Sequence, residues 1–206
     1  MPPSPRILIV DNDAIITHLV STMLQKKGYT IAGMVNTGGE ALLKSAELVP
    51  DLVIMDAFGS SSIPFHLVTR ESFALIRSRL APNGILAMNI EAIAWHDILV
   101  HSLAATLQEV FEHVLVLPMA EPPNTLGNLV LFASDLPLEL EEDPPVPTDR
   151  FSPEYNRAHA WDNRFTVDPD GVPVLTDDHN PVDLWAERVN LVARRWLHQH
   201  FDPRVG

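Results

Sequence analysis

Four polar residues at the ends of two apolar runs are the clearest indication of chemistry in this chain. Asp11, Asn12 and Asp13 directly follow the run ILIV, and Asp56 directly follows the run LVIM. Carboxylates that converge repel each other unless a cation lies between them, and Mg²⁺ prefers oxygen ligands of this kind. The set therefore predicts a Mg²⁺ site at Asp11, Asn12, Asp13 and Asp56, with transfer of a phosphoryl group onto Asp56.

An alternation of strand and helix patterns should bring these acids together. The patterns predict strands over 6–10, 29–35 and 51–55, with helices over 14–27 and 39–48 between them. Short connections and right-handed crossovers make such a β-α-β-α-β unit a parallel sheet. Parallel sheets carry functional residues at the carboxyl ends of neighbouring strands, so Asp11 and Asp56 are expected to be neighbours in space.

The rest of the chain continues the alternation. Its apolar patterns predict helices over 64–80, 95–113 and 182–201. They also predict strands over 85–90 and 114–117, and an antiparallel edge strand over 128–134. The fold class predicted is α/β: a three-layer, doubly wound, mostly parallel sheet, flavodoxin-like or Rossmann-like, in the order 2-1-3-4-5 plus an edge strand, with a C-terminal helical extension. One domain over 1–206 is expected, with halves at 1–56 and 57–136 and an acidic, Pro-rich excursion plus final helix at 137–206.

Residues 6–56, about a quarter of the chain, resemble the receiver domains of response regulators. That family has an acidic pair after its first strand and a phosphorylated Asp after its third. The resemblance implies that Asp56 is the phosphoacceptor, that Asp11 binds Mg²⁺ and that the partner is a sensor histidine kinase. Asn12 stands at the second acidic position, which removes one charge and should weaken metal binding. Asp13 either compensates for part of that charge or caps the helix that begins at Ala14.

The switch residues of the receiver family are missing from this sequence. The family uses Ser or Thr after the fourth strand and Lys after the fifth. Here these strands end in Asn89-Ile90-Glu91 and in Leu117-Pro118-Met119, and no Lys follows Lys44. A receiver-like module with degraded switch residues is therefore expected.

Three segments carry a second resemblance. They are DAF with IPFHL inside 56–67, LAPNGILA at 80–87 and LTDDHNPV at 175–182. With these segments, residues from about 52 to 201 look like the C-terminal part of spermidine-synthase-like proteins, which have a methyltransferase fold. In polyamine synthases the Asp at this strand end accepts a proton from the attacking amine, a role that again falls on Asp56.

The cofactor half of that second site is not recognisable. Methyltransferase-like folds hold an adenosyl cofactor with a Gly-rich loop after the first strand and an acid after the second. Here the first strand runs into Asp11-Asn12-Asp13, and Gly38-Gly39 after the second strand indicates a turn entering a helix. The resemblance therefore implies that the adenosyl cofactor does not bind and that aminopropyl transfer is lost.

Three functions follow from these patterns. The leading one is a receiver-like phosphoacceptor module, phosphorylated at Asp56 with the help of Mg²⁺ in phosphorelay signalling. The second is a relative of spermidine-synthase-like aminopropyltransferases that lacks the cofactor loop. The third is a folded natural or engineered chimera with no native activity.

The amino-acid composition excludes several classes of binding partner and site. The formal net charge is -13, which argues against non-specific nucleic-acid binding because that depends on cationic residues. The chain has no cysteine, so thiolate metal sites and disulfides are excluded. No run reaches the roughly 18 apolar residues of a membrane helix. A cytoplasmic protein is expected, and the sequence does not indicate its oligomeric state.

The spacing of the histidines gives little indication of a metal site. His96 and His101 are five residues apart and His198 and His200 two apart, so neither pair is expected to share a helix face. His179 lies in an acidic turn in which Asp178 or Asn180 should cap the last helix. Residues 60–62, SSS, are expected to form a flexible loop over the Asp56 pocket.

Overall fold

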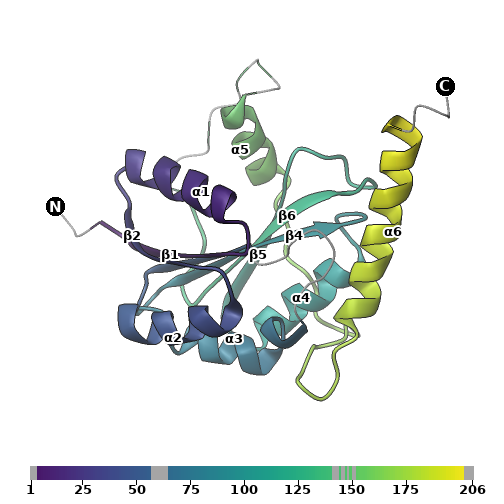
Figure 1. The fold of residues 1–206 in the computed structure, drawn as a ribbon. Coiled ribbons are helices and arrows are strands. Elements are labelled where there is room, and N and C mark those ends of the chain that lie inside the picture. Colours follow the sequence, from purple (N-terminus) through teal and green to yellow (C-terminus); the bar gives the residue numbers. More distant parts are fainter. Residues whose placement is uncertain are drawn as a thin grey trace.

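A single six-stranded sheet runs through both halves of the chain. The computed structural model describes residues 4–56, 65–140, 144, 147, 149 and 152–201. The strands are β1 (Arg6–Asp11), β2 (Thr30–Val35), β3 (Leu52–Asp56), β4 (Ile85–Ala92), β5 (His113–Pro118) and β6 (Gly127–Ser134). Their order in the sheet is β2-β1-β3-β4-β6-β5, and β1 to β4 are parallel (Figure 1). The receiver-like strands and the later strands therefore share one sheet, as the sequence predicted.

Helices cover the two faces of the sheet unequally. The helices are α1 (Ala14–Lys26), α2 (Gly38–Leu48), α3 (Arg70–Arg77), α4 (Ile98–Gln108), α5 (Pro153–Asp162) and α6 (Val182–Phe201), with a 3₁₀ turn at Phe65–Leu67. α1 and α5 lie on one face, α2, α3 and α4 lie on the other, and α6 runs beside α4 (Figure 1). None of the helices described is long and apolar enough to span a membrane.

The position of the last strand corrects the predicted order. β6 was expected at the edge, but it lies between β4 and β5 and pairs antiparallel with both. The reason is visible in its burial, because Leu129, Leu131 and Ala133 are almost fully buried, as in a central strand. β5 is the edge strand, and Phe165 covers its outer side with two backbone hydrogen bonds to Val116 of 2.9 and 3.0 Å. A mostly parallel sheet with one reversed strand before its edge is methyltransferase-like.

Side-chain caps explain where the helices begin. The predicted helix at 64–80 is divided, because Thr69 Oγ1 accepts from the backbone N–H of Ser72 and starts α3. The predicted helix at 95–113 begins only at Ile98, where Asp97 is the N-cap. Helix α5 was not predicted from the sequence. Its buried residues are Ala158, Ala160 and Trp161, so it lacks the apolar period of an amphipathic helix.

The core lies mainly between the sheet and the α2–α3–α4 layer. On that face the strand residues are almost fully buried: Val53, Met55, Leu86, Met88, Ile90, Leu129 and Leu131. On the α1–α5 face, Leu52, Ile54, Val130 and Phe132 are only half-buried. The segment before α6 is held against the α4 layer, because Thr106 Oγ1 accepts from Leu175 N at 2.9 Å.

The two halves of the chain meet tightly at the start of α2. Leu67, from the second half, is 5% exposed and packs against Gly38 from the first. A Cβ atom on Gly38 would overlap Leu67 Cδ2 and lie 2.7 Å from Cδ1 and 2.9 Å from Cγ. Gly38 thus permits a close approach between the halves that a residue with a side chain would prevent.

We predict that Gly38→Ala lowers the free energy of unfolding by about 1–3 kcal/mol, because the new methyl group overpacks a buried contact. The matched control is Gly39→Ala, where the added Cβ has nothing within 4 Å. That neighbouring substitution should stabilise the protein by about 0.4–1 kcal/mol through the unfolded chain. Urea denaturation of both variants measures the difference, and equal effects at the two positions would contradict the packing described.

Candidate functional site

Two carboxylates stand side by side at the carboxyl ends of β1 and β3. The parallel pairing places Asp11 opposite Asp56, four residue pairs along from Ile7 and Leu52. Strands alternate their side chains between faces, so both acids point to the α1 side of the sheet, as Ile9 and Ile54 do. The prediction that Asp11 and Asp56 are neighbours in space is confirmed.

Asn89 extends this pair onto a third strand. Met55 pairs with Met88, so Asn89 is the next residue beside Asp56. Its side-chain Nδ2 donates to Asp56 Oδ1 at 3.0 Å. Glu91 follows two residues later on β4 and therefore lies on the same face. The candidate site is thus a row formed by Asp11, Asp56 and Asn89 from three adjacent strands, with Glu91 beyond it.

Asp11 is a buried acid with few compensating contacts. Its residue surface is 3% exposed, and its Oδ1 accepts from the backbone N–H of Asp13 at 2.8 Å. Burial raises the pKa of the Asp11 carboxyl above its ordinary value, the Asp13 N–H opposes this, and the charges of Asp56 and Asp13 raise it further. The folded protein therefore disfavours the charged form of Asp11 unless a cation approaches.

None of the described Lys or Arg side chains forms an ion pair with Asp11 or Asp56. The ion pairs among the described residues are Lys44–Glu47, Arg70–Glu71, Arg77–Asp135 and Arg188–Asp97. None of these ion pairs includes Asp11 or Asp56. Among the described residues, the amide of Asn89 is the only side chain that donates a hydrogen bond to either carboxylate.

The other two predicted ligands lie differently. Asp13 is the N-cap of α1, where its Oδ1 accepts from Ile15 N at 2.8 Å and from Ile16 N at 3.1 Å. Asn12 is exposed at the turn. Within the described ranges, no group of three or more His, Asp or Glu residues is arranged to hold a metal ion. Asp11 and Asp56 with waters suit Mg²⁺, which accepts one or two carboxylates, and this ion stays a prediction.

Neither β1 nor β2 leads into an open Gly-rich loop, and the expectation that no adenosyl cofactor binds stays a prediction. A buried carboxylate, Asp11, ends β1 where a Gly-rich loop would be needed. Gly38 and Gly39 belong to the first turn of α2, and Leu67 fills the space in front of Gly38. The predicted loop at Ser60–Ser62 lies outside the described residues.

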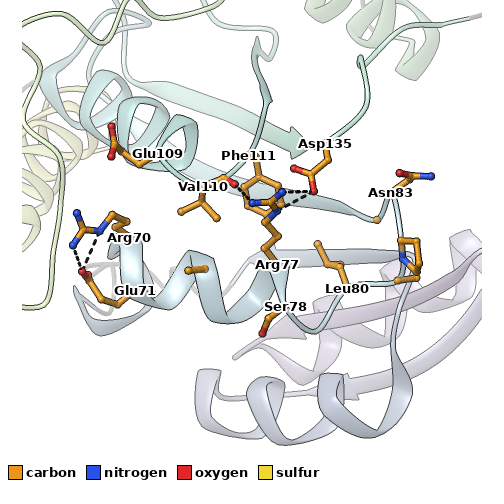
Figure 2. A pocket seen from close by; sticks show the side chains of 14 residues that line it. Arg70, Glu71, Arg77, Ser78, Leu80, Asn83, Glu109, Val110, Phe111 and Asp135 are labelled. Carbon is orange, nitrogen blue, oxygen red and sulfur yellow. Dashed lines mark hydrogen bonds and ion pairs between the residues drawn. The ribbon is translucent and has the colours of Figure 1, made fainter.

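A groove lies at the opposite end of the strands, where β4 and β5 begin. It has a volume of about 790 Å³ and lies between α3, the turn at Ala81–Gly84 and the segment before β5. Figure 2 shows that its arginines are already engaged: Arg70 with Glu71, and Arg77 with Asp135 and the carbonyl of Val110. Because its cations are paired and it is remote from Asp56, we do not assign it the chemistry of the site.

Comparison with known proteins finds two separate likenesses. The chain is 43% identical over 51 residues to the chemotaxis protein CheY of Thermotoga maritima, covering 25% of this chain and 42% of that protein. It is 35% identical over 57 residues to a probable C4-dicarboxylate response regulator DctR of Halalkalibacterium halodurans, covering 27% of this chain and 25% of that protein. It is 28% identical over 163 residues to a probable polyamine aminopropyl transferase of Bifidobacterium longum, covering 71% of this chain and 36% of that protein.

The chain joins two partial likenesses. It resembles response regulators over about a quarter of its length and a polyamine aminopropyl transferase over most of it, and it spans less than half the length of each of these relatives. No protein-family model matches it.

Two of the solved structures that the chain resembles have TM-scores below 0.5. A probable spermidine synthase from Corynebacterium glutamicum has a TM-score of 0.48 and 21% identity, covering 73% of this chain and 60% of that one. A SAM-dependent methyltransferase from Archaeoglobus fulgidus also has a TM-score of 0.48, with 11% identity, covering 64% of this chain and 86% of that one.

We predict that Asp11→Asn stabilises the protein at neutral pH. The raised pKa of Asp11 contributes stability that is complete below the ordinary value of 3.8 and is lost as pH rises through the folded value. At neutral pH the wild-type protein bears the cost of a buried charge, whereas Asn keeps the acceptor for Asp13 N and carries no charge. The higher stability of Asp11→Asn should appear as a higher melting temperature than that of the wild type at pH 7. This difference should disappear below about pH 3.8.

Asp168→Asn is the matched control. Asp168 also accepts the N–H two residues later, from Asp170 at 3.1 Å, but it is exposed. Its substitution should leave the melting temperature nearly unchanged at both pH values. A destabilised Asp11→Asn protein at pH 7 would contradict the burial argument.

Proposed function

We propose that the protein binds an organic cation of the polyamine class at Asp11 and Asp56, and that it does so without transferring an aminopropyl group. The observation that carries this proposal is the register pairing of the two acids at one end of the sheet, with no described cation beside them. A bound ammonium group would supply the missing positive charge and hydrogen-bond donors to both carboxylates.

The topology supports this function over phosphorelay signalling. A receiver switch needs a cationic group from the fifth strand beside the phosphorylated Asp. Here β6 lies between β4 and β5, so Pro118 at the end of β5 is separated from β3 by two strands. No Lys follows Lys44 in the chain. A phosphoryl group on Asp56 would therefore lack the contact that normally reports it.

The likeness to a polyamine aminopropyl transferase supports an amine as the cation. It covers 71% of this chain, against about a quarter for the response regulators. In this reading Asp56 accepts a hydrogen bond from an ammonium group, and Asp11 stabilises the same charge from the adjacent strand. Glu91, two residues beyond Asn89 and so about 7 Å along the strand, is placed for a second ammonium group.

The first test is calorimetric titration with spermidine and putrescine. We expect saturable binding to the wild-type protein and a loss of about tenfold to a hundredfold with Asp56→Asn, because a charge-assisted hydrogen bond contributes about 1.5–3 kcal/mol. Asp168→Asn, an exposed acid elsewhere, should bind as the wild type does. Propylamine, with one ammonium group, should bind more weakly than putrescine and should not respond to Glu91→Gln. Absence of spermidine binding, or equal binding by Asp56→Asn, would overturn the proposal.

A second function is favoured by the likeness to response regulators, 43% identity over 51 residues to a CheY protein and 35% over 57 residues to a DctR protein. In this alternative, Mg²⁺ at Asp11 and Asp56 supports phosphorylation of Asp56. Incubation with acetyl phosphate and Mg²⁺, followed by intact-mass measurement, tests it directly. A phosphoryl adduct that disappears in Asp56→Asn would establish the alternative. We expect no such adduct, because the site lacks the cation that receivers use.

A further inference from the structure

Two histidines that the sequence spacing separates are in direct contact. His96 and His101 were not expected to share a helix face, but His96 Nδ1 lies 3.2 Å from His101 Nε2. They do not share a helix face, because α4 begins only at Ile98 with Asp97 as its N-cap, but the spacing did not predict their contact. His96 therefore lies in the loop before the helix, and its ring folds back over the first turn to reach His101.

The separation of these nitrogens suits a metal ion. Zn²⁺ binds imidazole nitrogen at about 2.0–2.1 Å in tetrahedral geometry, so two of its ligands lie about 3.3 Å apart. The observed 3.2 Å is close to that edge length. In the structure one ring must donate its N–H to the other across this contact, and a bound ion would replace that proton because both nitrogens would then present a lone pair.

The backbone around the pair is held firmly. Trp95 N donates to Pro123 O at 3.0 Å, and His101 N donates to Asp97 O at 3.1 Å. The His96 ring also packs against the Phe165 ring, with centroids 4.7 Å apart. A chelating pair on such a support loses little conformational entropy when an ion binds.

The pair is accessible to an ion from solution. His96 is exposed, so an ion can reach it, and His101 is half-buried. The Asp97 carboxylate is already engaged, because it caps α4 and pairs with Arg188 at 3.9 Å, so the two imidazoles are the ligands that this segment offers.

We propose that His96 and His101 form a chelating site for a divalent transition-metal ion of the Zn²⁺, Ni²⁺ and Cu²⁺ class. Two imidazoles occupy two positions, and water or a group from another molecule completes the coordination. The ligands are borderline-soft nitrogens, so Mg²⁺ is not expected to compete here. The site is independent of the polyamine function proposed for Asp11 and Asp56.

The first experiment is titration with Ni²⁺ and with Zn²⁺ in a large excess of Mg²⁺, using the wild-type protein, His96→Gln, His101→Gln and the control His18→Gln. His18 is a single exposed histidine on α1. Loss of an outer-shell partner alone weakens metal sites about 10–100-fold, so loss of a ligand should weaken binding by at least about tenfold. His18→Gln should bind as the wild type does. Unchanged binding by His96→Gln and His101→Gln would overturn the proposal, because the ions would then lie elsewhere.

A spectroscopic readout keeps the test valid if His101→Gln folds poorly. His96 is exposed, so His96→Gln should fold normally by circular dichroism. In the electron paramagnetic resonance spectrum of the Cu²⁺ form, we expect coupling to two imidazole nitrogens in the wild type and to one in His96→Gln. The same nitrogen count in both proteins would overturn the proposal. Cu²⁺ should also bind more tightly than Ni²⁺ or Zn²⁺.

Discussion

The parallel pairing of β1 with β3 is the constraint on which the rest of this structure depends. It joins the two halves of the chain in one sheet, and its register sets Asp11 opposite Asp56. A slip of one residue would turn every side chain of one strand to the other face of the sheet. The acids would then separate, and Leu8 and Val10 would leave the core that both halves share. Packing of the apolar residues therefore fixes the position of the charges.

The second half of the chain determines what those charges can do. The reversed strand β6 moves β5 to the edge, away from Asp56, and the amide of Asn89 becomes the nearest side-chain donor. Asp13 is occupied as the cap of α1. The arrangement retains the acidic pair that is expected from the receiver-like first half. It places this pair in a sheet arranged like that of a methyltransferase. This combination supports the proposed cation site, whereas a phosphorylation switch needs groups that the sheet order keeps apart.

Much of this was accessible from the sequence, and the failures have identifiable causes. The apolar runs before Asp11 and Asp56 predicted both strands and their contact, because buried parallel strands have continuous apolar character. The position of β6 was wrong, because the order of elements along the chain does not fix whether a last strand adds at an edge or inserts. Asn89 and the contact of His96 with His101 were missed, because each depends on where an element ends. The cap at Asp97 was the signal for the histidines, since a residue before an N-cap does not follow helical spacing.

The most direct test of the account is a carboxyl-detected NMR titration of Asp11 in the wild-type protein and in Asp56→Asn. The account predicts that Asp11 titrates above its ordinary pKa, and that removing the Asp56 charge moves the midpoint downward. Saturating spermidine should lower it in the wild type as well. An Asp11 midpoint at its ordinary value, unaffected by Asp56→Asn, would show that the two carboxylates do not face each other across β1 and β3.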